Sequence, residues 1–280
     1  MARAHVDYLQ SQTLPWQPSH WAHLPGCQVK FLSRDPDSGA VSLLLRFPSG
    51  WAAREAGFLG TAEELLVIEG TLELDGRRYG QDCYGWFPPG HRHAVREAPG
   101  GAVALVFYDA DPLWTAGDPP AGRPAPAPTL VDAFELAWSA DGADPAFGGR
   151  DHRWKLLHGS PRASSATMLI ASPPHLHPSR WLAPQEIHPC AEEMFLLSGD
   201  FLCNIGQMCS GAYFWRPPGV AHGPYGSRGG NLALLRTHGA PLTTAFTDHE
   251  IELPQAPEYQ PLLPLAQRAL RTHPWRPLRY

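Results

Sequence analysis

The chain has 280 residues, a formal net charge of −5, a hydrophobic share of 43%, 31 prolines and 27 glycines. This length suits about two domains with real cores, which argues against a disordered protein. A negative charge without basic clusters gives no electrostatic reason to expect nucleic acid or an anionic membrane as a partner. So many prolines and glycines favour short strands joined by tight turns over long helices, so a mostly β fold is predicted.

The expected compartment is the cytoplasm. The amino end, MARAHVDYLQSQ, lacks an apolar core of signal-peptide length, and nowhere do roughly 18 apolar residues run together as a membrane span requires. The odd cysteine count, without any C-x-x-C pair, argues against a disulfide framework. Reduced thiols are therefore expected at Cys27, Cys83, Cys190, Cys203 and Cys209.

An internal repeat organises the chain. VKFLSRDPDSGAVSLLLRFPSG from Val29 matches WKLLHGSPRASSATMLIASPPH from Trp154, AEELLVIEGTLEL from Ala62 matches AEEMFLLSGDFLC from Ala191, and YGWFPPGHRHAV from Tyr84 matches YFWRPPGVAHGP from Tyr213. The last two pairs keep one constant offset, as do Gly100-Gly101 and Gly229-Gly230. Self-similarity of this kind predicts a duplicated domain.

The two copies are joined by DPLWTAGDPPAGRPAPAPTL, which reads as an extended linker because it is rich in Pro, Ala and Gly. We place the boundary near residue 120, giving domains 1–119 and 120–280. Within each copy, strand-sized runs recur with hairpin turn chemistry such as Asp75-Gly76, which predicts two small antiparallel barrels. A short C-terminal helix is expected over PLLPLAQRALRTH, whose leucines could pack on a barrel.

A candidate metal site begins in EIHPCAEEMFLLSG, residues 186–199. Residues two apart on a strand share a face, so Glu186 and His188 are expected to point together into the barrel. Glu192 begins the next apolar strand, and His222 follows the Pro-Pro-Gly corner of a distant one. Imidazole and carboxylate ligands of this mixture suit a divalent Fe, Mn, Co, Ni or Zn ion.

Charge compensation favours the metal interpretation. An isolated ionised carboxylate inside a small barrel costs several kcal/mol, and a bound dication would offset Glu186 and Glu192 together. Glu186 has several possible roles: metal ligand, hydrogen-bond acceptor behind a ligand, general base, or solvated side chain. Its neighbour on the other face, Glu193, is expected to be solvated. The expected pocket wall includes Met194, Tyr213 and Trp215.

Two other histidine groups are alternatives. His175 and His177 form an H-L-H pair upstream of Glu192, which would supply the ligands only if the intervening segment is an insertion. In the first copy, His91 and His93 with Glu63 could bind an ion weakly, although surface or turn roles are favoured there.

Both copies resemble the cupin superfamily, whose motifs read G-x5-H-x-H-x(3,4)-E-x6-G and G-x5-P-x-G-x2-H-x3-N. In the second copy the matching residues are His188, Glu192, Gly199, Gly211, Pro217, Gly219 and His222. Two positions depart from the motifs, because Glu186 replaces the first histidine and Gly226 replaces the asparagine.

In the first copy the motif residues kept are Glu63, Gly70, Pro88, Gly90 and His93. Gly57 and Leu59 occupy the positions of both first-motif histidines. The chain thus looks like a bicupin, similar to ChrR-type cupins and to acetylacetone-cleaving oxygenases. The resemblance implies two jelly-roll barrels (double-stranded β-helices), of which the first is degenerate and the second binds metal.

The favoured function is a non-haem Fe(II)-type dioxygenase acting on a small enolisable or phenolic compound, with Glu186 as the candidate base. Mn, Ni, Co or Zn are other possible metals. The alternatives are a non-redox metal-dependent cupin (isomerase, decarboxylase or cyclase) and a metal-dependent small-molecule sensor without turnover. A homodimer is a further possibility, because barrel edges often pair with a second chain.

Overall fold

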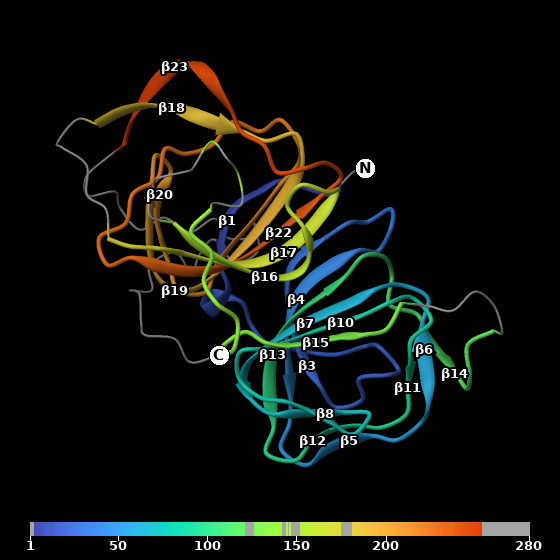
Figure 1. Ribbon diagram of the computed structural model, residues 1–280. Helices are drawn as coiled ribbons and strands as arrows, with labels where there is room; N and C mark the ends of the chain where they lie inside the picture. The colour runs from blue at the N-terminus through green and yellow to red at the C-terminus, as the bar shows by residue number, and fades with distance from the viewer. Residues whose placement is uncertain are drawn as a thin grey trace. The chain divides into compact units, whose positions relative to one another are not determined.

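The computed structural model of the chain describes residues 3–120, 126–141, 144, 146, 152–174 and 181–253. Its regular structure is nearly all β-strand, arranged as jelly-roll barrels (Figure 1), so the all-β prediction is confirmed. Two elements of the sequence analysis, the C-terminal helix and the pair His175/His177, lie outside the described residues. Within the described residues, no helix is long and apolar enough to cross a membrane.

The chain divides into two compact units, which differ from the predicted domains. The first, here called the N-terminal barrel, contains Leu14–Leu136; the second, the C-terminal barrel, contains His5–Thr13 and the chain from Ala137 onward. The boundary expected near residue 120 therefore needs correction. The reason is strand pairing, since β15 (Thr129–Asp132) pairs with the N-terminal barrel and β1 (Val6–Gln10) pairs with the C-terminal one.

The N-terminal barrel is built from one large sheet and two small ones. The large sheet has the order β15-β10-β7-β13-β4-β3-β2, and the small sheets have the orders β11-β6-β14 and β5-β12-β8-β9. The remaining strands of this barrel are β2 (Gln17–Pro18), β3 (Gln28–Arg34), β4 (Val41–Phe47), β5 (Trp51–Ala53), β6 (Gly57–Leu59), β7 (Glu63–Gly70), β8 (Leu72–Leu74), β9 (Arg77–Tyr79), β10 (Cys83–Phe87), β11 (Arg92–His93), β12 (Arg96–Ala98), β13 (Ala102–Tyr108) and β14 (Trp114–Ala116).

The C-terminal barrel repeats this plan. Its large sheet has the order β1-β21-β19-β22-β17-β16, with β20 paired to β19, and β18 pairs with β23. Its other elements are the 3-10 turn η1 (Ser11–Thr13) and the strands β16 (Arg153–Ser160), β17 (Ser165–Ser172), β18 (Trp181–Ile187), β19 (Ala191–Cys203), β20 (Gly206–Cys209), β21 (Ala212–Arg216), β22 (Asn231–His238) and β23 (Ala245–Leu253).

Equivalent strands of the two copies occupy equivalent places. The order β10-β7-β13-β4-β3 in the first large sheet corresponds to β21-β19-β22-β17-β16 in the second. Each sheet also gains an edge strand from a distant part of the chain, β15 beside β10 and β1 beside β21. Each addition pairs the backbone groups of β10 or β21 and makes β15 or β1 the new edge strand of its sheet.

The motif glycines have a steric origin in both barrels. Gly70 and Gly199 adopt positive φ values of 75° and 83°, and a Cβ on either would overlap the carbonyl oxygen of Gly101 or Gly230. Only glycine combines that conformation with so close an approach of two strands. Gly101 and Gly230, which they approach, also have positive φ values, of 81° and 80°.

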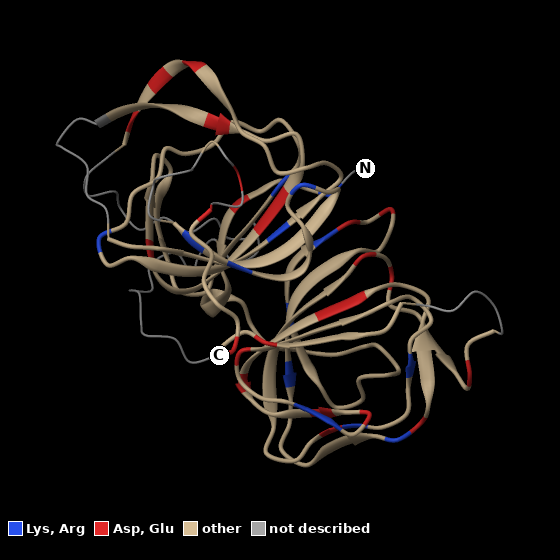
Figure 2. Ribbon diagram, in the orientation of Figure 1, with Lys and Arg blue, Asp and Glu red and all other residues tan. Residues whose placement is uncertain are grey.

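Acidic side chains gather on the β18–β23 pair, which carries Asp248, Glu250 and Glu252 on β23 and Glu186 on β18 (Figure 2). Neither strand contains Lys or Arg. Ala183, Pro184 and Phe246 of this pair line a cavity of the C-terminal barrel. These two strands therefore offer no Lys or Arg side chain to a polyanion.

Candidate metal centre

Three predicted site residues come together in the C-terminal barrel. Glu186, His188 and His222 each offer a ligand atom, and these atoms all lie within 4.8 Å of one another. An isolated β-bridge aligns two of them, since the Glu186 amide donates to the His222 carbonyl (2.8 Å) and the His222 amide donates back (3.0 Å). The Gly219 amide donates to the His188 carbonyl at 2.9 Å, which ties the Pro-Pro-Gly turn to the same place.

Both imidazoles are oriented by backbone carbonyls. His188 Nδ1 lies 3.0 Å from the Thr243 carbonyl oxygen, and His222 Nδ1 lies 2.9 Å from that of Val220. A carbonyl only accepts hydrogen bonds, so Nδ1 carries a proton, and in the neutral form of each imidazole Nε2 keeps its lone pair. Metal-binding histidines in proteins are held in this way. The two rings, with centroids 5.0 Å apart, therefore fit a shared ion.

Polar residues behind His188 extend this arrangement. The Thr244 hydroxyl lies 3.2 Å from His188 Nδ1 and donates a short hydrogen bond to Asp144. Asp144 is itself buried. The sequence analysis missed both residues because they precede and follow the motifs by dozens of positions, and no local pattern marks them.

Glu192 lies beside this group but outside the 4.8 Å cluster. Its Oε2 is 3.5 Å from His222 Nε2 and 3.6 Å from Arg216 Nη1, and although it is buried it accepts no hydrogen bond from the residues that the structure describes. Burial raises the pKa of Glu192, but the nearby His222, His188 and Arg216 more than offset this and lower it. An ionised, buried oxygen without a hydrogen-bond donor is a suitable metal ligand.

The charge state of His222 also suits metal binding. Burial lowers its pKa to about 4, with Arg216 acting in the same direction and Glu192 against it. His222 is therefore neutral at pH 7, and a neutral imidazole is the form that binds metal.

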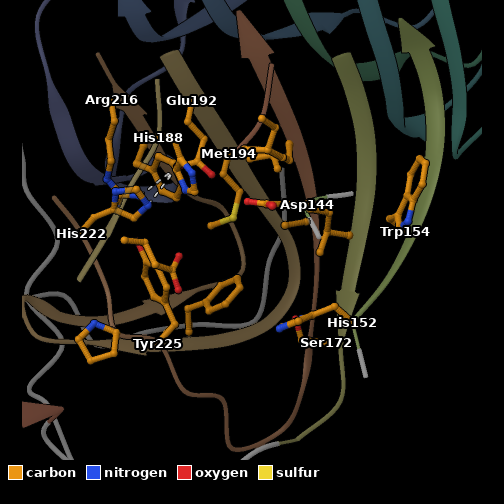
Figure 3. Close-up of a pocket in the computed structure, with 18 of the residues that line it drawn as sticks. Asp144, His152, Trp154, Ser172, His188, Glu192, Met194, Arg216, His222 and Tyr225 are labelled. Carbon is orange, nitrogen blue, oxygen red and sulfur yellow. Dashed lines mark hydrogen bonds and ion pairs between the residues drawn. The ribbon is translucent and has the colours of Figure 1, made fainter. Parts of the chain in front are cut away.

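The site opens onto a cavity of about 600 Å³ inside the C-terminal barrel (Figure 3). The cavity is lined by Asp144, His152, Arg153, Trp154, Ile170, Ser172, Ala183, Pro184, Glu186, His188, Glu192, Met194, Phe201, Phe214, Arg216, His222, Pro224, Tyr225, Ala233, Leu235, Leu242 and Phe246. This combination of a largely apolar wall and a few convergent polar groups is typical of a small-molecule site.

The predicted pocket wall needs two corrections. Met194 lines the cavity, but Tyr213 and Trp215 do not; Phe214 and Arg216 of the same strand line it instead. Side chains alternate along a strand, so the prediction chose the wrong face of β21. Tyr213 lies on the opposite side, where its hydroxyl donates to Glu193 at 2.7 Å.

Glu193 is also different from the prediction. It is 1% exposed rather than solvated, and it forms a short ion pair with Arg236 of β22. The first copy repeats the tyrosine contact, since the Tyr84 hydroxyl donates to Glu64 at 2.6 Å. The second glutamate of each A-E-E segment is thus part of the barrel wall.

The N-terminal barrel contains a second group that could hold a metal: Asp75, His91 and His93. The sequence analysis identified the histidines but missed Asp75. One oxygen of Asp75 accepts from the Ala94 and Val95 amides (2.6 and 3.1 Å), and the other lies 3.5 Å from His91 Nε2 and 3.4 Å from His93 Nδ1. The carboxylate is therefore already partnered on both sides.

His93 differs electrostatically from its counterpart His222. Its Nε2 lies 3.2 Å from Glu63 Oε2, and although burial lowers its pKa, hydrogen bonds with Asp75 and Glu63 raise it overall. Protonated His93 can thus balance these carboxylates without a metal. The place of a first-motif histidine is filled too, since a Cβ on Gly57 would fall within 2.5 Å of the Trp114 ring.

Comparisons with known proteins agree with this architecture. Residues 4–110 match the family model of the ChrR Cupin-like domain, whereas no curated protein matches the chain. A candidate dioxygenase from Nostoc punctiforme is 17% identical with a TM-score of 0.72, over 90% of this chain and 91% of that one.

Two other solved structures are similar. Protein Ylba from E. coli is 15% identical with a TM-score of 0.56, covering 84% of this chain and 91% of that one. Oxalate decarboxylase from Bacillus subtilis is 13% identical with a TM-score of 0.52, covering 90% and 78%. At these identities the likeness shows the fold alone. Together with the internal repeat, it shows that the chain has a two-barrel cupin fold, and its residues 4–110 match the ChrR Cupin-like domain.

Proposed function

We propose that the chain is a metal-dependent enzyme, specifically a non-haem Fe(II)-type dioxygenase that acts on a small enolisable or phenolic compound. Glu186, His188, Glu192 and His222 would hold one ion in the C-terminal barrel. The observation that supports this most strongly is the pair of Nδ1–carbonyl contacts, which leaves two Nε2 lone pairs beside Glu186 at the edge of the cavity.

The metal would polarise a substrate oxygen and, if it is iron, supply electron-transfer chemistry with O2. In such a dioxygenation both oxygen atoms enter the products and the substrate supplies the electrons, so no external reductant is needed. A role for Glu186 in proton abstraction is supported by its position, because it lies in the ligand group and also lines the cavity. Met194, Phe201 and Leu235 provide an apolar wall that limits water near the reacting atoms.

The two barrels provide a matched test of the one-site proposal. His222 and His93 occupy the same motif position in the two copies, so His222→Ala and His93→Ala should differ. We expect the untagged wild-type protein to hold one first-row metal per chain, His222→Ala to weaken metal affinity by at least about 100-fold, and His93→Ala to leave metal content unchanged. Elemental analysis and chelator competition measure this; equal losses in both variants would refute a single site.

The oxygenase step needs a separate experiment. Fe(II)-loaded protein would be screened against 1,3-dicarbonyl and phenolic compounds, with O2 uptake and product recorded in air and under anaerobic conditions. We expect turnover only in air, with ¹⁸O from labelled O2 in the product.

A non-redox cupin enzyme is the second candidate, favoured by the position of Glu186 as a candidate base in a largely apolar cavity. It predicts turnover without O2, for example isomerisation or decarboxylation. The same anaerobic reactions therefore decide between the two chemistries, because product formed at equal rates with and without O2 would exclude the oxygenase.

A further inference from the structure

The cavity of the C-terminal barrel contains a buried cation whose donors are incompletely used. Arg216, the last residue of β21, is 3% exposed, and neither its Nε nor its Nη1 has a hydrogen-bond partner among the described residues. The ion-pair contact that it makes within this part of the chain is long, 3.6 Å from Nη1 to Glu192 Oε2. Burying a guanidinium with unmade hydrogen bonds costs free energy, which a ligand that accepts those bonds would recover.

Aromatic rings lie against the Arg216 guanidinium without accepting hydrogen bonds from Nε or Nη1. The guanidinium lies over the Phe214 ring, 3.6 Å from its centroid, and 5.9 Å from that of Tyr225. An aromatic ring covers a face of the guanidinium plane, whereas the N–H groups lie within that plane. Phe214, Arg216 and Tyr225 all line the cavity, and Figure 3 shows Arg216 beside His222 and Glu192.

A purely structural role as the counterion of Glu192 explains Arg216 less well. The equivalent glutamate of the first barrel, Glu63, accepts from the Tyr108 hydroxyl at 2.9 Å and contacts His93 at 3.2 Å. The residue aligned with Arg216 in that barrel is Phe87, so a glutamate at this position does not require an arginine from this strand. The first barrel instead has the buried Arg96 of another strand near Glu63, and Arg96 Nη2 donates to the His23 carbonyl at 2.8 Å. The Nε and Nη1 groups of Arg216, by contrast, have no hydrogen-bond partner among the described residues.

We propose that Arg216 binds a carboxylate of the substrate, so that the substrate class is a small enolisable acid rather than a neutral compound. This inference rests on the proposed function and adds to it the substrate group, a carboxylate, that Arg216 would bind. Arg216 and the ligand group share Glu192 as a neighbour, at 3.6 Å from Arg216 and 3.5 Å from His222. A carboxylate on Arg216 would therefore place the adjacent enolisable carbonyl near the candidate metal ligands.

The test is a comparison of an acid with its ester. Phenylpyruvate and methyl phenylpyruvate would be titrated calorimetrically into full-length protein loaded with Zn(II), which prevents redox turnover. We expect the wild-type protein to prefer the acid by about 30-fold, because a hydrogen-bonded ion pair forms only with the carboxylate. Arg216→Gln should abolish the preference while ester affinity and zinc content stay unchanged, and Arg216→Lys should keep part of it.

The control is Arg162→Gln, which removes one exposed cation from the β16–β17 turn of the same barrel and should keep the full preference. Three results would overturn the proposal: wild type that binds neither compound or both equally, an equal loss in the control, or loss of zinc from both Arg216 variants. The last would make Arg216 a positioning residue for Glu192. Failure of the oxygenase proposal alone would leave the acid preference intact.

Discussion

Glu192 and Glu193 are sequence neighbours on β19 with opposite surroundings. Glu192 faces the cavity beside His222 and Arg216, whereas Glu193 faces Arg236 and Tyr213 on the other side of the sheet. Both are buried, so each carboxylate needs a positive partner. For Glu193 that partner is a side chain, and for Glu192 it is proposed to include a metal.

This contrast predicts different effects of the same chemical change. Glu192→Gln should weaken metal affinity by about 10- to 100-fold with little loss of fold stability, because the carboxylate is removed from the ligand group. Glu193→Gln should cost about 3 kcal/mol of unfolding free energy, because Arg236 stays buried without its counterion, while metal affinity is kept. Chelator competition and denaturant unfolding measure the two quantities; a reversed pattern would contradict the proposed roles.

Residue spacing was sufficient to find much of the candidate site but not all of it. The motif spacing predicted Glu186, His188 and His222 as site residues, and the structure brings these three together. Which side chains of β21 point into the barrel depends on its register with β19 and β1. The sequence alone therefore could not show which alternate residues of YFWR face the cavity. The partners of Glu193 and His188 likewise come from strands distant in sequence.

At the level of elements, β1 completes the C-terminal barrel. It pairs antiparallel with β21, the strand that carries Arg216, and Tyr8 of β1 is fully buried in that barrel's core. The Tyr8 hydroxyl also donates to the Gln207 carbonyl at 3.3 Å. The start of the chain therefore stabilises the barrel proposed to bind metal.

Shortening the Tyr8 side chain tests this dependence. Tyr8→Ala should lower the unfolding free energy of the C-terminal barrel by about 3 to 5 kcal/mol, because it leaves a cavity in the core. Amide hydrogen exchange should accelerate in β19 and β21 but not in β7 and β10. The exposed Gln17 of β2 provides the control Gln17→Ala, which should change neither. Uniform acceleration across both barrels would show that β1 acts on the whole chain.

The pairing of β1 and β15 explains why domain boundaries were harder to predict than the fold. The repeat and the turn chemistry were local signals, and the two barrels they indicated are present. Edge strands exchanged over long sequence distances leave no local pattern, and VDYLQ and TLVD resemble any short strand. The proline-rich linker was visible, but the strand that follows it belongs to the first barrel.

At the scale of the whole molecule, the two barrels share one fold but differ in the residues that surround their buried carboxylates. The motif positions of Glu186 and His188 are Gly57 and Leu59 in the first copy, and Arg216 corresponds to Phe87. The N-terminal barrel balances Glu63 and Asp75 with His93, whose pKa is raised, whereas burial lowers the pKa of His222. The first barrel thus neutralises its charges internally, whereas the second is proposed to do so with a bound metal and substrate.

Metal removal should therefore affect one barrel. Dialysis against a chelator should destabilise the C-terminal barrel by about 3 kcal/mol relative to protein with free metal at 100 times its Kd, since only the folded state binds the ion. Hydrogen exchange in β19, β21 and β22 should rise, while β7, β10 and β13 keep their protection. Equal changes in both barrels, or none, would count against a single metal site.

The position of β1 has a consequence for synthesis on the ribosome. β1 emerges before the N-terminal barrel, but its partner β21 begins only at Ala212, after that entire barrel. At translation rates of roughly 5 to 20 residues per second, the strand waits on the order of 10 to 40 s without its partner. The nascent chain must therefore keep an apolar strand from pairing elsewhere while the first barrel folds behind it.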